Sequence, residues 1–179
     1  TTYYYRVRAT NSAGDSANTA VASATTQVAP SCAATPRLLA FGDSITLGVA
    51  DAGGFPFIGW RNPLQLLMTP AHDWVGRFSD PAGDATFDIQ HFGVSGMDTF
   101  QALDPAIAQT WYGYDGTRSL WRIAYEDYLP KPNPACSKAT IHLGTNDAIG
   151  TRVLADSANN ILTMVNQLDA YDPTVQVYV

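Results

Sequence analysis

Apolar and polar residues alternate near the start of the chain, over residues 3–9, with the period of two that predicts a half-buried strand. Turn-forming residues follow at 11–14, and the alternation returns over 19–25. Residues 1–26 therefore predict a β-hairpin. Residues 27–36 contain two prolines and no periodicity, which is typical of a linker.

Beyond the linker, short apolar strands alternate with amphipathic helices. Strands are predicted at 37–41, 86–92, 140–143 and 175–179, and helices at 62–68, 100–109 and 120–128. The clearest helix lies between the last two strands, where apolar residues recur along one face: Leu154, Ala158, Ile161, Val165 and Leu168. This alternation predicts a parallel sheet in a three-layer α/β domain over 37–179.

A polar or glycine-rich motif follows each of the first three predicted strands. The motifs are GDSIT at 42–46, GVSG at 93–96 and GTND at 144–147. Because chemistry gathers at the carboxyl ends of parallel strands, we expect these motifs to form one site.

Three residues of these motifs suit the binding of a developing negative charge. Ser44 begins a helix and offers a hydroxyl and a backbone N–H. Gly96 allows close backbone approach, and the Asn146 amide is a neutral donor. Each motif taken alone also fits a helix cap or a turn.

The blocks FGDSITLG, HFGVSG and HLGTND, in this order, resemble the first three signature blocks of the SGNH, or GDSL, hydrolases. The resemblance covers residues 37–179 and implies a flavodoxin-like α/β/α domain that hydrolyses esters. It implies Ser44 as the nucleophile. The backbone N–H groups of Ser44 and Gly96 and the Asn146 amide would form the oxyanion hole. No metal or organic cofactor is implied.

Finer motifs point to a subfamily. HFGVSG (91–96), DWVG (73–76) and GWR (59–61) resemble the carbohydrate esterases of the acetyl xylan esterase type. The resemblance implies O-deacetylation of a polysaccharide or of a small acylated substrate. A non-catalytic carbohydrate-binding or adhesive module on the same scaffold is the alternative.

The hairpin carries a second resemblance. YYYRVRATNSAGDSA is similar to the last two strands of a fibronectin type III module, which implies that residues 1–26 are the remnant of such a sandwich. Such modules often accompany secreted polysaccharide enzymes, so we expect a secreted, extracellular protein. A hairpin that belongs to the main domain remains the other interpretation.

The fourth family block, an Asp-x-x-His near the C-terminus, does not follow the third block in this chain. We therefore expect an incomplete sheet and an internal fragment whose catalytic histidine and aspartate lie beyond Val179, so that the chain alone is inactive. None of His72, His91 and His142 is expected to replace that base, although His91 lies nearest the predicted site.

Residues 111–128 are dense in aromatic side chains, namely Trp111, Tyr112, Tyr114, Trp121, Tyr125 and Tyr128. They could stack against sugars, but aromatic residues that close a loop over a core are more common.

Composition and charge make some classes of binding partner improbable. The net charge of the 179 residues is −6 and Lys/Arg runs are absent, which argues against nucleic acid and anionic membranes. No apolar stretch reaches the roughly 18 residues of a membrane-spanning helix.

Two cysteines, Cys32 and Cys136, are too few and too far apart for a zinc site, and they form either two thiols or one disulfide. In the flavodoxin-like strand order, the strands that follow them are neighbours about 4.8 Å apart. We therefore expect a Cys32–Cys136 disulfide.

Overall fold

The computed structural model describes residues 2–8, 10–12, 14–25, 35–48, 59–68, 71–79, 90–129, 131 and 136–179. The chain divides into two compact units, Thr1–Ser31 and Cys32–Val179. Each unit is described by itself.

The first unit is a β-hairpin, as predicted, formed by β1 (Thr2–Tyr5), β2 (Thr10–Asn11), β3 (Gly14–Asp15) and β4 (Ala22–Thr25). Strand β1 pairs antiparallel with β4, and β2 pairs with β3 near the turn. The prediction of a half-buried face is wrong, because Tyr5 is 54% and Val7 is 66% exposed. A hairpin alone supplies no second layer to cover that face.

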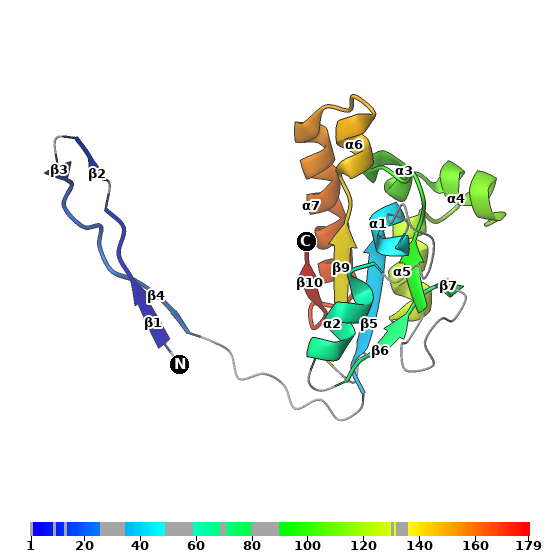
Figure 1. Cartoon of the computed structure of the whole chain (residues 1–179), viewed down its shortest axis with the longest axis horizontal. Coiled ribbons are helices and arrows are strands. Elements are labelled where there is room, and N and C mark those ends of the chain that lie inside the picture. Colours follow the sequence, from blue (N-terminus) through cyan, green and yellow to red (C-terminus); the bar gives the residue numbers. More distant parts are fainter. Residues whose placement is uncertain are drawn as a thin grey trace. The chain divides into compact units, whose positions relative to one another are not determined.

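The second unit is built on a mainly parallel sheet (Figure 1). Its strands are β5 (Arg37–Gly42), β6 (Asp73–Val75), β7 (Phe78–Ser79), β8 (Gln90–Gly93), β9 (Lys138–His142) and β10 (Gln176–Tyr178). The order is β10-β9-β5-β8-β7, and β6 pairs with the first half of β5 on the side of β8. Only β7 runs antiparallel to its neighbour in this described sheet.

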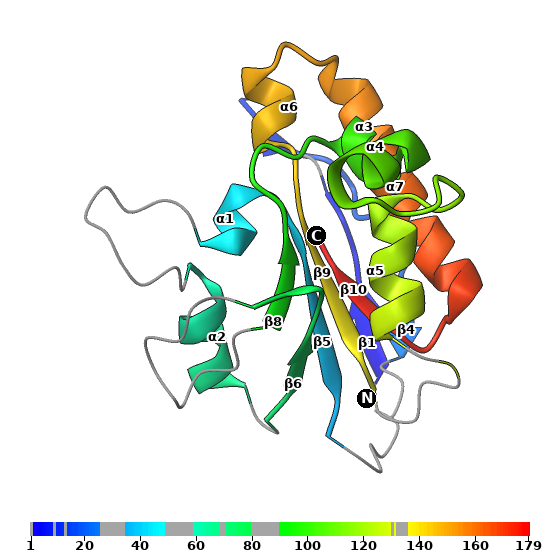
Figure 2. The same cartoon turned by 90° about the vertical axis from the view of Figure 1, so that its right-hand side faces the viewer.

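Helices cover both faces of this sheet. They are α1 (Ser44–Leu47), α2 (Arg61–Leu67), α3 (Thr99–Leu103), α4 (Pro105–Tyr112), α5 (Leu120–Tyr128), α6 (Thr145–Ile149) and α7 (Leu154–Tyr171). Figure 2 shows α1 and α2 on one side of the sheet and α5 and α7 on the other. The predicted α/β architecture with a mainly parallel sheet is confirmed.

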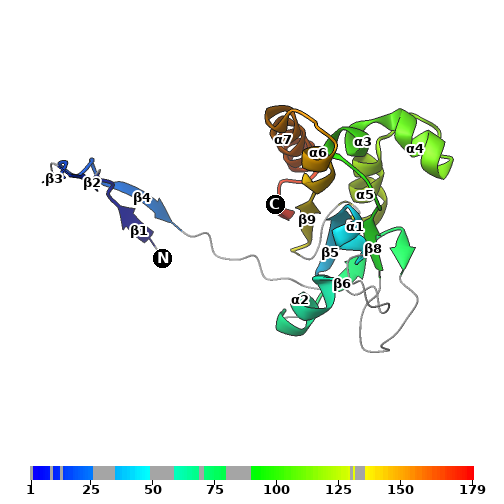
Figure 3. The same ribbon diagram turned by 45° about the horizontal axis from the view of Figure 1, so that its top comes forward.

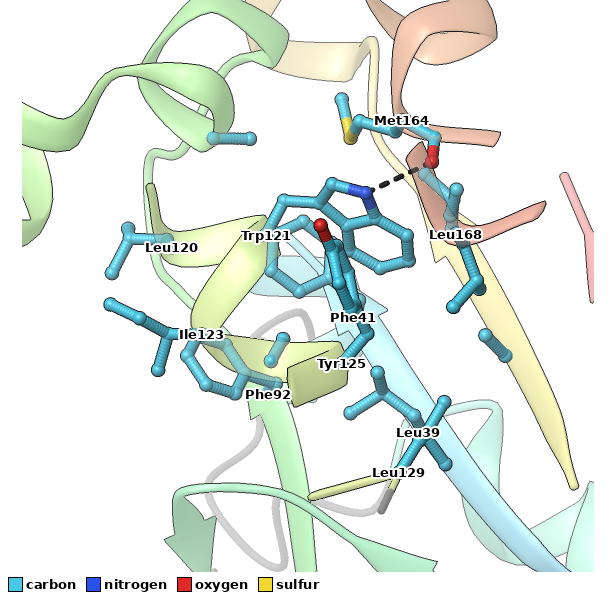
Figure 4. Close-up of a cluster of buried hydrophobic side chains, with 14 of the residues drawn as sticks. Leu39, Phe41, Phe92, Leu120, Trp121, Ile123, Tyr125, Leu129, Met164 and Leu168 are labelled. Atoms are coloured by element: carbon cyan, nitrogen blue, oxygen red, sulfur yellow. Dashed lines mark hydrogen bonds between the residues drawn. The ribbon is translucent and has the colours of Figure 1, made fainter. Parts of the chain in front are cut away.

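The larger core lies between the sheet and helices α5 and α7 (Figure 4). The Phe41 ring lies 4.9 Å from Trp121 and 5.5 Å from Phe92, centroid to centroid. Trp121 is fully buried, and its indole N–H donates to the Met164 carbonyl at 3.0 Å. Because side chains alternate along β5, Leu38 and Ala40 face the other way. They form a smaller core with Trp74 beneath α2.

Some elements differ from the sequence prediction. The expected helix over 100–109 is two helices, because Pro105 lacks the N–H that would continue α3. The Asp104 carboxylate accepts the Ala106 N–H at 2.8 Å and caps α4. Strands β6 and β7 were not predicted. Strand β8 begins at Gln90, and residues 86–89 of the predicted strand lie outside the described residues.

The aromatic segment 111–128 is mostly structural. Trp121 is fully buried and Tyr125 is 5% exposed, so the sugar-stacking hypothesis is wrong for these two side chains. Trp111 is 38% exposed. Arg77 lies over the rings of Tyr112 and Tyr114, at 5.4 and 4.7 Å from their centroids.

Cys136, which lies two residues before β9, takes part in a disulfide, as expected. Its expected partner Cys32 is the other cysteine of the chain and lies outside the described residues.

Candidate active site

The carboxyl ends of three neighbouring strands are aligned at one edge of the sheet. Gly42, the last residue of β5, is in register with Gly93 on β8 and with His142 on β9. The chain continues from these ends into α1, into the loop before α3 and into α6 (Figure 3). The three predicted motifs therefore leave the sheet side by side.

Backbone hydrogen bonds hold these strand ends together. The Val94 N–H donates to the Gly42 carbonyl at 2.9 Å, and the Asp43 N–H donates to the His142 carbonyl at 3.3 Å. The register thus extends by one residue into the motifs that carry Ser44 and Gly96.

Ser44 is the first residue of α1. The buried Asp43 precedes it as the N-cap, and its carboxylate accepts the Ile45 N–H at 2.9 Å. The first N–H groups of a helix have no partner within the helix, so the Ser44 backbone is suited to hold an anion.

Two glycines allow α1 to lie close to the sheet. A Cβ on Gly93 would lie 2.4 Å from the Leu47 nitrogen. A Cβ on Gly42 would lie 2.5 Å from the His142 carbonyl oxygen. A side chain at either position would push α1 and Ser44 away from the neighbouring strand ends.

Gly96 has a different reason to be glycine. Its φ is +78°, in the left-handed region, and a Cβ there would meet nothing within 4 Å. The residue is exposed. The conformation, and not the space, favours glycine, and the open surroundings leave room for a ligand beside the backbone.

Asn146 lies in the first turn of α6. Its side-chain amide donates to the Met97 carbonyl at 3.0 Å, which joins the α6 segment to the Gly96 loop. A carboxamide nitrogen carries two hydrogens, so this bond leaves one for a ligand.

Asp147 holds the same two segments together, a role that the sequence did not reveal. The fully buried carboxylate accepts the Thr99 N–H at 3.0 Å and the Thr99 hydroxyl at 2.5 Å. Asn160 on α7 donates to the Thr99 oxygen at 3.2 Å. The sequence signal was an acidic residue next to Asn146, in a motif that also fits a helix cap.

The three histidines occupy different places. His91 is fully buried, and its Nδ1 accepts the Gly93 N–H at 2.9 Å. His72 directly precedes β6, and its Nε2 lies 2.7 Å from the amine of Lys138, the first residue of β9. His142 ends β9 with a side chain 46% exposed, and its Nδ1 lies 3.9 Å from the Asp43 carboxylate. His142, and not His91, is the described histidine exposed at this edge.

Three buried polar atoms at this edge have no hydrogen-bond partner among the described residues, namely Asp43 Oδ2, Thr46 Oγ1 and Trp60 Nε1. The Trp60 ring lies 6.4 Å from that of His142. Buried polar groups are normally paired, so these atoms have hydrogen-bonding capacity that the described residues do not use.

The described part of the chain holds no cluster of three or more His, Cys, Asp or Glu side chains that could bind a metal. It also holds no helix long and apolar enough to cross a membrane.

Neither a family model nor a curated protein sequence matches the chain, but solved structures do. The chain is similar to a family 3 carbohydrate esterase from Clostridium thermocellum, with 20% identity and a TM-score of 0.55. It is similar to a carbohydrate esterase of family 3 from Talaromyces cellulolyticus, with 22% identity and a TM-score of 0.53. A third similar structure is an acetyl esterase mutant with an acetate ion, at 21% identity and a TM-score of 0.55.

Each of these matches covers 80% of this chain and 60% of the other chain. The chain therefore spans about 60% of the length of the structures that it matches. This likeness shows that the chain shares the α/β fold of these esterases.

Proposed function

We propose that the chain carries the ester-hydrolysing site of an SGNH-type carbohydrate esterase. One observation supports this most strongly: Ser44, Gly96 and Asn146 follow three aligned strand ends that hydrogen bonds join, in a fold shared with carbohydrate esterases. The proposed reaction is O-deacetylation of a polysaccharide or of a small acylated substrate.

In this proposal the Ser44 hydroxyl attacks the ester carbonyl, and a histidine base takes its proton. Attack places negative charge on the carbonyl oxygen. The Ser44 and Gly96 N–H groups and the Asn146 amide donate to that oxyanion, and all three donors are held in place before the charge develops.

The domain organisation belongs to the same proposal. Residues 1–26 would be the end of a fibronectin type III-like module, 27–36 a linker and 37–179 the hydrolase domain. We propose a secreted protein. The disulfide at Cys136 supports this localisation, because disulfides persist mainly in oxidising compartments.

The test is acetate release from acetylated xylan and from p-nitrophenyl acetate, measured on the full-length protein and its Ser44→Ala variant. Loss of the nucleophile should lower kcat by a factor of about 10³ or more. Ser79→Ala is the matched control, because Ser79 is an exposed serine on β7. Undiminished acetate release by Ser44→Ala would contradict the proposal, and xylan binding without hydrolysis would favour the non-catalytic module.

The source of the base has its own test. If a histidine beyond Val179 serves, His142→Gln should leave kcat of the full-length protein within about twofold of the parent. A loss as large as that of Ser44→Ala would assign the base to His142 instead.

A further inference from the structure

A buried arginine closes the far end of the helix that begins with Ser44. Arg61 is fully buried. Its Nε–H donates to the Thr46 carbonyl at 2.9 Å, and its Nη2 donates to the Leu47 carbonyl at 3.5 Å. Burying a guanidinium is costly unless its donors are used, so a specific arrangement must compensate for this burial.

Helix α1 needs such support because it contains only four residues, Ser44–Leu47. One isolated turn is unstable in water, and its last carbonyls have no partner within the helix. The Gly48 N–H donates to the Ser44 and Ile45 carbonyls at 2.9 and 3.2 Å. Arg61 takes the next two carbonyls, and its positive charge suits the carboxyl end of a helix.

Arg61 also joins α1 to a second element of the site. Its Nη1 donates to the carbonyl of Gln90, the first residue of β8, at 3.5 Å. Strand β8 leads to the Gly96 loop. At the end of β8 next to this loop, Gly93 also lies close to Leu47 of α1, so α1 and β8 are joined at both ends of the strand, directly at Gly93 and through Arg61 at Gln90. One guanidinium thus contacts both the helix that begins with Ser44 and the strand that leads to Gly96.

We propose that Arg61 is a positioning residue for the Ser44 site. Its contacts with α1 and β8 set the position of the Ser44 hydroxyl and N–H relative to the Gly96 N–H. Arg61 itself contacts no reacting atom. Lysine cannot replace it, because a single ammonium does not reproduce the planar fork that reaches carbonyls on two elements. This inference rests on the proposed function.

The test compares Arg61→Lys and Arg61→Gln with the parent full-length protein. We expect kcat for p-nitrophenyl acetate to fall about 10–100-fold at a temperature where each variant is folded, because small displacements of a nucleophile are costly. KM should stay within about twofold, because the carbonyl of the ground state gains little from these donors. Met164→Ala is the control, since Met164 is fully buried in the core on the other face of the sheet. It should lower the Tm while kcat per folded molecule stays within about twofold.

Amide hydrogen exchange supplies a readout that does not depend on activity. The Leu47 N–H donates to the Asp43 carbonyl and the Gly48 N–H to the Ser44 and Ile45 carbonyls. Both groups should exchange at least about tenfold faster in Arg61→Lys than in the parent or in Met164→Ala. Parental kcat and parental exchange in Arg61→Lys would overturn the proposal. An equal loss of kcat in Met164→Ala, or failure of both Arg61 variants to fold, would assign Arg61 a general role in folding and would also overturn it.

Failure of the proposed function looks different. In that case Ser44→Ala would keep the parental turnover, whereas the exchange rates in α1 would still report whether Arg61 holds this helix.

Discussion

Two regions that meet at the end of β5 are built on opposite principles. Phe41 faces the aromatic core and packs against Trp121 and Phe92. Two residues later, the Asp43 carboxylate is equally buried but accepts a backbone N–H of α1 and leaves one oxygen unpaired. The core is held by non-directional apolar contact, and the edge is held by directional bonds to main-chain atoms.

This difference indicates that residues of the core contribute mainly to stability and residues of the edge mainly to function. Apolar packing tolerates changes of similar volume, so the core determines mainly the free energy of unfolding. At the edge, hydrogen bonds through Asn146, Asp147 and Arg61 hold the segments that carry the proposed donors. A substitution of Asn146 should change kcat more than stability.

The largest effect on stability is expected for Trp121→Ala. Removing this buried ring should lower the free energy of unfolding by about 3–5 kcal/mol, because the surrounding side chains cannot fill the space. Urea unfolding measures the change, with Trp121→Phe as a milder control that keeps a ring but loses the bond to the Met164 carbonyl. A loss below about 1 kcal/mol would mean that this core is not tightly packed.

Asn146→Ala should show the reverse pattern in the full-length protein. Loss of one oxyanion donor should lower kcat by about 10²–10³, equivalent to roughly 2.7–4 kcal/mol, with little change in KM. Stability should fall by only about 1 kcal/mol through the lost bond to the Met97 carbonyl. Lowered stability with unchanged kcat would remove Asn146 from the site and leave it a structural residue.

A smaller effect should appear at high pH. Burial raises the pKa values of four tyrosines in the second unit, Tyr112, Tyr125, Tyr128 and Tyr171. Their folded pKa values exceed the unfolded ones, so the stability that they contribute is complete below about pH 10 and is lost as pH rises through the folded values.

Thermal unfolding between about pH 8 and pH 11.5 measures this loss. Tyr125→Phe should weaken the alkaline decline, because Tyr125 is the most deeply buried of the four. An equal decline in that variant would place the alkaline sensitivity in other groups.

The smallest effect is expected outside both regions. Strands β1 and β4 pair with each other, and Tyr4 and Tyr5 are 73% and 54% exposed. Deleting residues 1–26 should therefore change the stability of the second unit by less than about 0.5 kcal/mol. Calorimetry with and without these residues decides the matter, and a large fall in Tm would make the hairpin part of the main domain.

Periodicity in the sequence was sufficient for the long elements. The repeat from Leu154 to Leu168 marks α7, and the predicted helix 120–128 coincides with α5. Strand β6 is missing from the sequence prediction because three residues are too few to show a period. That Trp74 is a core residue follows only from its packing beneath α2. Local pattern therefore identifies elements that are long enough to repeat.

The site was predictable as a set of motifs and not as a set of contacts. The positions of Ser44, Gly96 and Asn146 after successive strands followed from the sequence. The approach of His142 to Asp43 depends on the register of β9 against β5, which no local pattern contains. The partners of Arg61 lie 15 and 29 residues away, at Thr46 and Gln90.

Gly42 and Gly93, the closely packed glycines that end β5 and β8, limit which substitutions this chain can accept as its sequence diverges. Identity to the similar solved structures is only 20–22%, so the fold is the same although most residues differ. Gly42 and Gly93 have no smaller substitute, and any larger residue must displace backbone or a packed side chain. Sequence drift should therefore exchange apolar residues freely around these two positions while leaving both as glycine. Two such glycines, each at the end of an apolar strand, would therefore mark this close packing of helix on sheet better than overall sequence identity does.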